Sequence, residues 1–237
     1  MKSIKVFATA AMLAVGMSAS AQFSGGASSS SSTVDTKGWS SLWVEWNPSS
    51  FKVDVKNADD QSFTGLSLGY SQAFNVLPSK PLFVEAGLGL QYSFYKEDLG
   101  DGYDYYYDDY DAEQKFSMLS IKIPVNLLYK FDIPNSSVSL MTHAGINLRY
   151  NLSAKMKYTY EDYYDEESKE VDLFDKKDMG SDKATWNRFQ LGWQIGVKAR
   201  FGQNFLVGVS YGSDFSEIAK KTKVSTTTIS LGYVFDK

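Results

Sequence analysis

Hydrophobic and polar residues alternate along the chain without a break between Phe189 and Phe201. One set of positions carries Phe189, Leu191, Trp193, Ile195, Val197, Ala199 and Phe201, and the positions between them carry Gln190, Gly192, Gln194, Gly196, Lys198 and Arg200. A helix would distribute both sets around its circumference, whereas a β-strand places them on opposite faces. The pattern therefore predicts a long β-strand.

The same alternation recurs in three further long segments, at 82–94, 119–131 and 138–150, and more weakly at 42–46, 63–74, 205–211 and 226–235. The links between these segments alternate in length, with turn-like links at 77–81, 132–137 and 202–204, and long polar links at 52–62, 96–115, 151–185 and 212–223. In an antiparallel barrel with an even number of strands, all short turns lie at one rim and all long loops at the other. We therefore predict an all-β fold, an antiparallel up-and-down β-barrel of about eight strands.

The composition of the two faces distinguishes a barrel in lipid from a barrel in water. The polar face is rich in glycine, which weakens a solvated strand but leaves room for long side chains inside a narrow barrel. The apolar face carries aromatic residues near the strand ends, where tyrosine and tryptophan favour a membrane interface. Because a closed barrel also pairs every backbone group in lipid, we predict a transmembrane barrel and keep a soluble, lipocalin-like binding barrel as the alternative. The polar network that we expect in its lumen consists of Glu45, Glu85, Lys122, His143, Arg149, Lys198 and Arg200.

The first residues have the composition of an export signal. Lys2 and Lys5 precede an apolar run at 6–17, and small residues follow it, so we expect a signal peptide at 1–21 that is cleaved near Ala21. Residues 22–38 then form a flexible Ser/Gly-rich leader, and the barrel domain covers 39–237. Export and a lipid-facing barrel together predict the bacterial outer membrane, whose lipid surrounds the protein.

Composition excludes several classes of site. The chain has 0 cysteines, which rules out disulfides and cysteine metal sites. Its formal net charge of -4 comes without a basic stripe, so we expect no nucleic-acid partner. We also expect no cofactor.

Four short motifs are similar to those of a known family. They are the Ser-Ala-Gln at 20–22, Ile-Pro-Val-Asn-Leu-Leu-Tyr-Lys-Phe at 123–131, Gly-Ile-Asn-Leu-Arg-Tyr-Asn-Leu at 145–152 and Leu-Gly-Tyr-Val-Phe at 231–235. Together they resemble the PorT-like outer membrane β-barrel proteins of Bacteroidetes-type bacteria. The resemblance implies a small outer membrane barrel, no shared catalytic residues, and insertion by the barrel assembly machinery. The insertion signal that this machinery recognises often ends at an aromatic residue, whereas here Asp236 and Lys237 follow Phe235.

His143 is the only histidine, so any catalytic group with a histidine base must include it. It lies near the middle of a predicted strand on the polar face, away from the rim where a lipid or peptide substrate would arrive. Ser120 and Ser139 are conceivable partners, but nothing in the sequence pairs either serine with it. We therefore expect a hydrogen-bonded interior histidine and no catalytic residues.

Two of the long links combine carboxylates with tyrosines. The external loop surface that we expect is formed by Asp104, Tyr105, Tyr106, Tyr107, Asp108, Asp109, Tyr163 and Tyr164. Carboxylates suit Ca²⁺ or Mg²⁺, but the spacing does not match an EF-hand, so we predict solvated loops without a metal site. Tyrosine adds contact area at little entropic cost, which makes these loops candidates for binding an extracellular ligand or protein.

These observations favour an integral outer membrane barrel with a structural or recognition role and no catalysis. Two alternatives stay open. One is a narrow channel for ions or small solutes through the charged interior, and the other is a hydrolase whose reacting groups lie at the rim.

Overall fold

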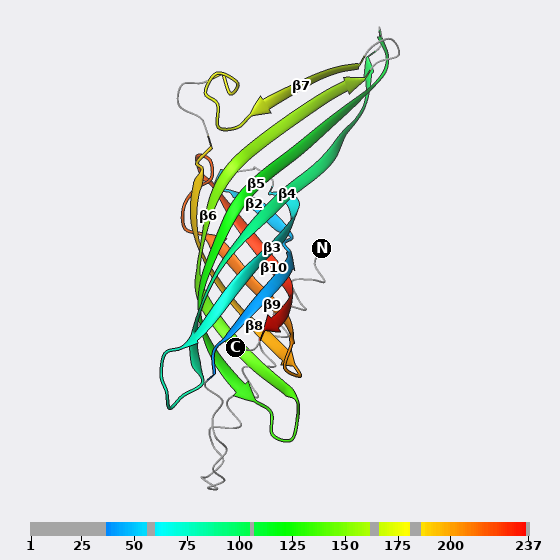
Figure 1. The fold of residues 1–237 in the computed structure, drawn as a ribbon. Coiled ribbons are helices and arrows are strands. Elements are labelled where there is room, and N and C mark those ends of the chain that lie inside the picture. Colours follow the sequence, from blue (N-terminus) through cyan, green and yellow to red (C-terminus); the bar gives the residue numbers. More distant parts are fainter. Residues whose placement is uncertain (1–36, 56–59, 105–106, 162–165, 181–185, 236–237) are drawn as a thin grey trace.

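The computed structural model describes residues 37–55, 60–104, 107–161, 166–180 and 186–235 and, within them, all side chains except those of 99–104, 107–111 and 161. These residues form one sheet of ten strands in which neighbouring strands are antiparallel (Figure 1). The strands are β1 (Trp39–Trp46), β2 (Ser49–Val53), β3 (Gln61–Asn75), β4 (Leu82–Asp104), β5 (Tyr107–Asp132), β6 (Val138–Glu161), β7 (Glu166–Asp172), β8 (Phe189–Phe201), β9 (Phe205–Asp214) and β10 (Thr222–Phe235).

The sheet closes into a barrel of eight strand positions. β1 and β2 share one position, because both lie between β3 and β10 and only Asn47 and Pro48 separate them. The ladder continues across this break, since Asn47 and Gly65 exchange backbone hydrogen bonds of 2.7 and 3.0 Å. The other wall strands follow in the order β3, β4, β5, β6, β8, β9 and β10, whereas β7 pairs with β6 alone. The predicted up-and-down barrel of about eight strands is confirmed.

The two rims differ in the length of their connections. At one rim, which we call the turn end, links at 76–81, 133–137 and 202–204 join β3 to β4, β5 to β6 and β8 to β9. Asn135 and Gly202 adopt the left-handed backbone that such turns require, with φ of 58° and 61°. The opposite rim, the loop end, carries the connections after β2, β4, β6 and β9.

The prediction of long loops at the loop end is wrong for two segments. β4 continues to Asp104 and β5 begins at Tyr107, so most of 96–115 is a paired hairpin. β6 likewise continues to Glu161 and pairs with β7, so much of 151–185 is strand. The backbone ladder persists here although the β4–β5 register shifts between Asp98 and Asp101 and again between Gly102 and Asp104, because tyrosine is a good strand former. The other two long links are also shorter than predicted, since β2 ends at Val53 and β10 begins at Thr222.

These extensions form a four-stranded sheet that leaves the barrel. We call it the protruding sheet and define it as 95–104 of β4, 107–118 of β5, 154–161 of β6, and β7. Figure 1 shows it leaning away above the loop end. At its base, Leu119 pairs with Ser153 but Ser120 pairs with Asn151, so Leu152 is the extra residue of a β-bulge. Such a bulge bends its strand at the point where the sheet departs.

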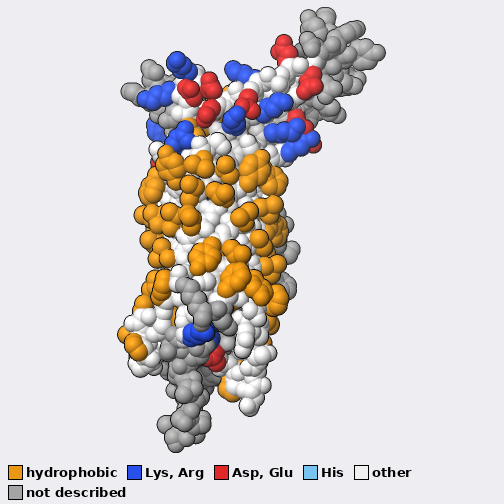
Figure 2. Space-filling view, in the orientation of Figure 1, with side chains coloured by type: hydrophobic (Ala, Val, Ile, Leu, Met, Phe, Trp, Pro, Cys, Tyr) orange, Lys and Arg blue, Asp and Glu red, His pale blue; other side chains and the backbone are white. Residues whose placement is uncertain are grey.

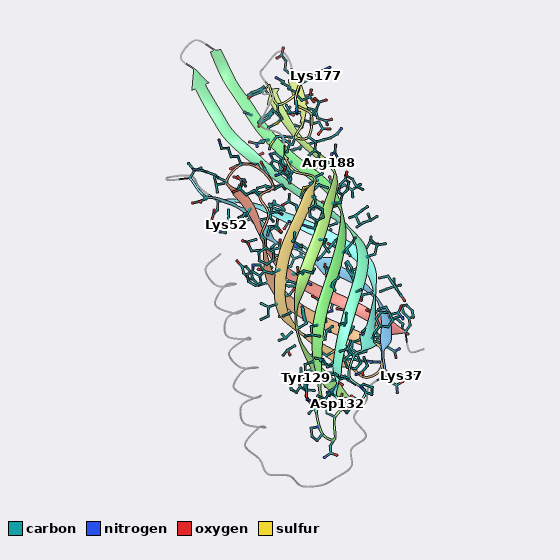
Figure 3. The ribbon with its side chains drawn as sticks, turned by 90° about the vertical axis from the view of Figure 1, so that its left-hand side faces the viewer. Lys37, Lys52, Tyr129, Asp132, Lys177 and Arg188 are labelled. Atoms are coloured by element: carbon teal, nitrogen blue, oxygen red, sulfur yellow. The ribbon has the colours of Figure 1, made fainter. Side chains whose placement is uncertain are left out.

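Arg188, just before β8, holds the backbone at this bulge. Its Nη1 donates to the carbonyl oxygens of Asn151 at 3.2 Å and Leu152 at 2.7 Å, and its guanidinium lies 4.2 Å from the centroid of the Phe174 ring. Figure 3 shows Arg188 and Lys52 at the loop end, with Tyr129 and Asp132 at the turn end. The connection from β7 to β8 is thereby fixed to the rim of the barrel.

The outer face of the barrel is an apolar band. Leu68 and Leu88 are exposed over 63% and 59% of their surface, and Ile195 over 45%. Figure 2 shows hydrophobic side chains covering the barrel, with charged side chains gathered above them. A contiguous apolar surface of this extent is not stable in water, so this face lies in lipid, and the soluble lipocalin-like alternative is wrong. Among the described residues, no helix has both the length and the apolar character needed to cross a membrane.

The inside of the barrel contains two apolar clusters as well as the polar groups. The turn-end cluster consists of Trp39, Ala73, Phe83, Leu128, Met141, Leu206 and Val234. The loop-end cluster consists of Phe51, Phe63, Phe116, Met118, Ala154, Leu173, Ile218 and Val224. The inward face is therefore polar only in its middle portion, and not along its whole length as the alternation suggested.

Candidate functional site

Two ion pairs cross the middle of the lumen. Lys122 Nζ on β5 lies 2.6 Å from Glu45 Oε2 on β1, and the lysine side chain is 3% exposed. Lys198 Nζ on β8 lies 2.6 Å from Glu85 Oε2 on β4. Each pair joins strands that are not neighbours, so it spans the barrel interior. Burying either charge alone would cost several kcal/mol, which the opposite charge offsets.

Glu85 accepts the most hydrogen bonds of these four charged groups. The Ser71 hydroxyl donates to its Oε1 at 3.1 Å, and Asn126 Nδ2 donates to its Oε2 at 3.3 Å. Gln194 Nε2 in turn donates to Asn126 Oδ1 at 2.6 Å. The carboxylate is thus held by four strands, β3, β4, β5 and β8, which fixes their interior spacing.

Arg149 forms a third buried pair, with Asp214 at the end of β9. Sequence reasoning missed Asp214, because it placed 212–223 in a loop. The alternation of the strand could have identified it, because Asp214 continues the inward-facing positions that include Gly208 and Gly212. Arg200, by contrast, lies at the turn end, where its Nε donates to the Gln203 carbonyl at 2.9 Å and its guanidinium lies 5.9 Å from the Trp39 ring centroid.

Glycines make room for a tryptophan in this interior. A Cβ atom on Gly69 would lie 2.3 Å from Trp43 Cζ2, and one on Gly89 would lie 2.4 Å from Trp43 Cη2. Gly69 and Gly89 are direct cross-strand partners, so the indole ring covers both. Lys122 Nζ lies 5.8 Å from the centroid of the same ring. The small residues therefore allow a large one to fill the lumen, as a barrel of eight strands requires.

His143 is buried in the lumen, with 5% of its surface exposed. It lines a cavity of about 40 Å³ together with Glu85 and Lys198, enough for about two or three water molecules. Its Nδ1 has no hydrogen-bond partner among the described residues. The two serines considered beside it bond elsewhere: the Ser120 hydroxyl donates to Asn151 at 2.7 Å and the Ser139 hydroxyl to Asp132 at 2.6 Å.

The two apolar clusters separate this polar network from both rims. A second cavity, lined by Arg149 and Asp214, measures only about 20 Å³. At the loop end, Phe51, Phe63 and Phe116 pack on one another with ring centroids 4.4 to 5.9 Å apart. At the turn end, the Trp39 and Phe83 rings lie 4.7 Å apart. The chemistry available inside is therefore ion pairing and water binding within a filled barrel.

Four of the eight residues that we predicted to form an external loop surface lie instead in strands of the protruding sheet. Asp104, Tyr107, Asp108 and Asp109 lie in β4 and β5, in the part whose side chains are not described, and Tyr105, Tyr106, Tyr163 and Tyr164 lie outside the described residues. The backbone register places four acidic residues in one row across the four strands, Asp101, Asp111, Glu161 and Glu166. We call this set the acidic row.

A second row, nearer to the membrane, is basic. Lys96 on β4 pairs in register with Lys115 on β5, which pairs with Lys157 on β6. We call these three residues the lysine row. Glu113 contacts both Lys96 and Lys115. Hydrogen bonds from Lys115 and Lys96 lower the pKa of the Glu113 carboxyl, and the hydrogen bond with Glu113 is the main cause that raises the pKa of Lys96.

The inward face of the protruding sheet is apolar. Tyr95 and Met156 pack against the loop-end cluster. Burial raises the pKa of Tyr95 to about 12, so its hydroxyl stays protonated, and Gln114 Nε2 donates to that hydroxyl at 2.8 Å. Among the residues that the structure describes, no three or more His, Asp or Glu side chains gather in a way that could hold a metal ion.

Comparison with known proteins assigns the family. A family model described as outer membrane protein beta-barrel domain matches residues 18–219. This chain is an outer membrane β-barrel protein. It lies in the lipid bilayer of a bacterial outer membrane, with the apolar band against the lipid.

Several solved structures are similar to this outer membrane barrel. Ail of Yersinia pestis, in complex with the heparin analogue sucrose octasulfate, is 18% identical over 84% of this chain and 99% of that chain, with a TM-score of 0.42. Neisserial surface protein A is 15% identical over 84% and 97%, with a TM-score of 0.38. A major outer membrane protein of Thermus thermophilus is 16% identical over 83% and 99%, with a TM-score of 0.37. No curated protein matches the chain.

Proposed function

We propose that this outer membrane barrel is a non-conducting, non-catalytic anchor that presents the protruding sheet outside the cell to a basic partner protein. The observation that carries the proposal is the continued pairing of β4 with β5 beyond Phe94, as far as Asp104 and Tyr107. At about 3.3 Å per residue, ten residues of strand extend the hairpin roughly 30 Å beyond the apolar band, measured along the strand. A paired sheet positions a surface more rigidly than a solvated loop does.

The acidic row supports the choice of a basic partner. Like charges directly opposite one another on neighbouring strands destabilise a sheet, and here four acidic residues occupy such positions. Glu166 in the row and the adjacent Glu167 are both exposed. A partner that brings lysine or arginine side chains would relieve this repulsion, and the charges would also speed its association.

The filled interior argues against the channel alternative. Apolar side chains occupy both ends of the lumen, and ion pairs occupy its middle. We expect no steady unitary currents when the pure protein is inserted into a planar lipid bilayer. Steady currents would favour the channel instead.

The position of His143 argues against the hydrolase alternative. The histidine lies between the two apolar clusters and bonds to neither serine that could act with it. We therefore expect His143→Ala to leave the lipids and peptides of the cell envelope unchanged. A changed envelope composition in that variant would support catalysis.

A photoreactive amino acid placed at the exposed Glu167 tests the recognition role in intact cells of the native host. We expect a crosslink to one surface or extracellular protein. It should be lost when the acidic row is neutralised by Asp101→Asn, Asp111→Asn, Glu161→Gln and Glu166→Gln. A matched control neutralises four other exposed carboxylates at the loop end, by Asp54→Asn, Asp60→Asn, Asp175→Asn and Asp178→Asn, and should keep the crosslink. A crosslink that survives neutralisation of the row, or the lack of any crosslink, would contradict the proposal.

We also propose a narrower family and a route of export for this protein. The motifs at 123–131 and 145–152 support a PorT-like barrel of the Bacteroidetes type, exported with cleavage near Ala21 and inserted by the barrel assembly machinery. The mass of the mature protein purified from outer membranes tests the cleavage site. A mature protein that begins far from Gln22 would contradict it.

A further inference from the structure

The base of the protruding sheet carries a basic surface at the height where a bilayer has its headgroups. On β4, Tyr92 and Phe94 face the lipid, exposed over 50% and 39% of their surface, and their rings stack with centroids 5.7 Å apart. Lys96 follows on the same face of the strand. Two residues of strand rise about 7 Å, which matches the thickness of the headgroup region outside the hydrocarbon core. The lysine row therefore lies level with the lipid headgroups.

This surface forms an open cleft of about 420 Å³. Its lining includes the aromatic pair Tyr92 and Phe94 and four lysines, Lys96, Lys115, Lys155 and Lys157. The aromatic rings form its lower, lipid-facing side and the lysines its upper side. An apolar wall beside a cluster of cations fits an amphipathic ligand with an anionic head.

The ion pairs within the cleft are unevenly distributed among its lysines. Glu113 contacts Lys96 and Lys115, and Lys155 Nζ lies 2.5 Å from Glu170. Asp98 is 3.5 Å from Lys96. A fourth carboxylate, Asp172, pairs in register with Lys155. Lys157 pairs in register with Glu170 but has no ion-pair partner within 4 Å among the described side chains.

The register of the lysine row points to an anion as well. Lys96, Lys115 and Lys157 are direct cross-strand neighbours, and like charges in such positions repel one another. A phosphate group accepts charge-assisted hydrogen bonds from several ammonium groups at once, which turns that repulsion into binding. A basic cluster beside a membrane contributes about 1 kcal/mol per lysine to the attraction of anionic lipid.

We propose that the lysine row, with Lys155, binds the phosphate groups of a phosphorylated glycolipid of the outer leaflet. The acyl chains of the bound lipid lie against Tyr92 and Phe94. The bound lipid fixes the protruding sheet at its base and so sets its angle to the membrane. This site is separate from the acidic row, which lies farther from the membrane on the same four strands.

The experiment uses the mature protein in non-ionic detergent micelles, with native mass spectrometry to count bound lipid. The probes are diphosphorylated lipid A and the same lipid with both phosphates removed. We expect the protein to retain the phosphorylated lipid about tenfold more than the dephosphorylated one. Water-soluble glucosamine phosphate should not displace it, because the soluble compound lacks the acyl chains.

Three variants make the test specific. Lys96→Gln, Lys115→Gln and Lys157→Gln together should lower lipid retention about tenfold, while arginine at the same three positions should keep it. The matched control, Lys169→Gln, Lys176→Gln and Lys177→Gln, removes the same charge from exposed lysines beyond the cleft and should bind as the wild type does. Retention within twofold of wild type in the first variant, equal retention of both lipids, or displacement by the soluble phosphate would overturn the proposal. Crosslinking at Glu167 does not depend on this result, so the two proposals can fail separately.

Discussion

In β4, β5 and β6, the apolar and polar faces are exchanged between the barrel and the protruding sheet above the membrane edge. Within the barrel, β5 turns Ile121 and Ile123 outward and Lys122 inward. Above the edge, it turns Lys115 outward and Phe116 inward. β4 and β6 change in the same way, with lysines replacing aromatic and aliphatic residues on the outer face. Residues still alternate between the two faces, but the outward face changes from apolar to polar and the inward face from polar to apolar.

This inversion follows from the solvent on the outer side. In lipid, the outer face must be apolar, and the narrow interior can hold polar groups that bond with one another. Above the lipid, the outer face meets water, so the sheet buries its apolar side against the connection that contains Trp186, as a soluble sheet does. The step from Phe94 to Lys96 therefore marks the membrane edge on β4.

Phe116→Ala should have the largest effect, because Phe116 is 1% exposed in the loop-end cluster that supports the protruding sheet. We expect a loss of about 3–5 kcal/mol in the free energy of unfolding, measured by urea denaturation in lipid vesicles. The neighbouring Lys115→Ala, on the outward face, should cost less than about 0.5 kcal/mol. Equal losses in both variants would contradict the inward packing of the sheet.

Leu88→Arg should have the second-largest effect on the free energy of unfolding, since Leu88 lies in the middle of the apolar band of β4. A charge on the lipid-facing side near the bilayer centre costs about 2–4 kcal/mol. The same new residue above the edge, Ser168→Arg at an exposed position of β7, should stay within about 0.5 kcal/mol of wild type. Similar stabilities for the two arginine variants would contradict the position of the edge.

Glu85→Gln tests the polar interior. The change keeps the shape of the side chain but leaves Lys198 without its counter-charge, so we expect a loss of about 2 kcal/mol. Lys198→Met together with Glu85→Gln should recover part of the loss, because the unpaired charge is then gone. An additive effect of the two changes in urea denaturation would show that the pair is not coupled.

The smallest effect concerns pH and the base of the protruding sheet. The pKa of Glu113 is lowered from its ordinary value of 4.5 by Lys115 and Lys96, so its contribution to stability is present above pH 4.5 and is lost as the pH falls through its pKa in the folded protein. The pKa of Lys96 is raised from 10.5, so the lysine stays charged throughout this range. Hydrogen exchange of the amides around Glu113 should therefore speed up below pH 4.5, after correction for intrinsic rates. In Glu113→Gln this additional acceleration should be absent, and its persistence there would assign it to other carboxylates.

The barrel wall could be predicted from the sequence because lipid imposes one rule on every strand. Wherever the outer face is apolar, the alternation identifies the strand, as it does for the segments at 82–94 and 189–201. The prediction stops at Phe94 because the rule changes there, although the strand continues to Asp104. The apolar clusters were missed although Phe83 and Leu128 stand at inward positions of predicted strands, as exceptions to the polar face.

The partners within the lumen could not be predicted. Parity places Glu45 and Lys122 in the interior, but it does not say that β1 and β5 face each other at that level. Contacts across a barrel depend on the tilt and stagger of the strands, which the register of all the ladders sets together. For Arg149 the sequence could not identify the partner, because Asp214 lies beyond the predicted end of the strand at 205–211.

The seam between β1 and β10 has a consequence for how the protein folds. Ser40 pairs with Gln72 on β3 on one side and with Phe235 on β10 on the other, so one side of the first wall strand is paired by a segment far away in the sequence. β10 also pairs with β2 and β9, and a chain that stops before it would leave two unsatisfied edges in hydrocarbon. Closure therefore requires β10, and because it joins such distant parts of the chain, we expect it to be a slow step of folding.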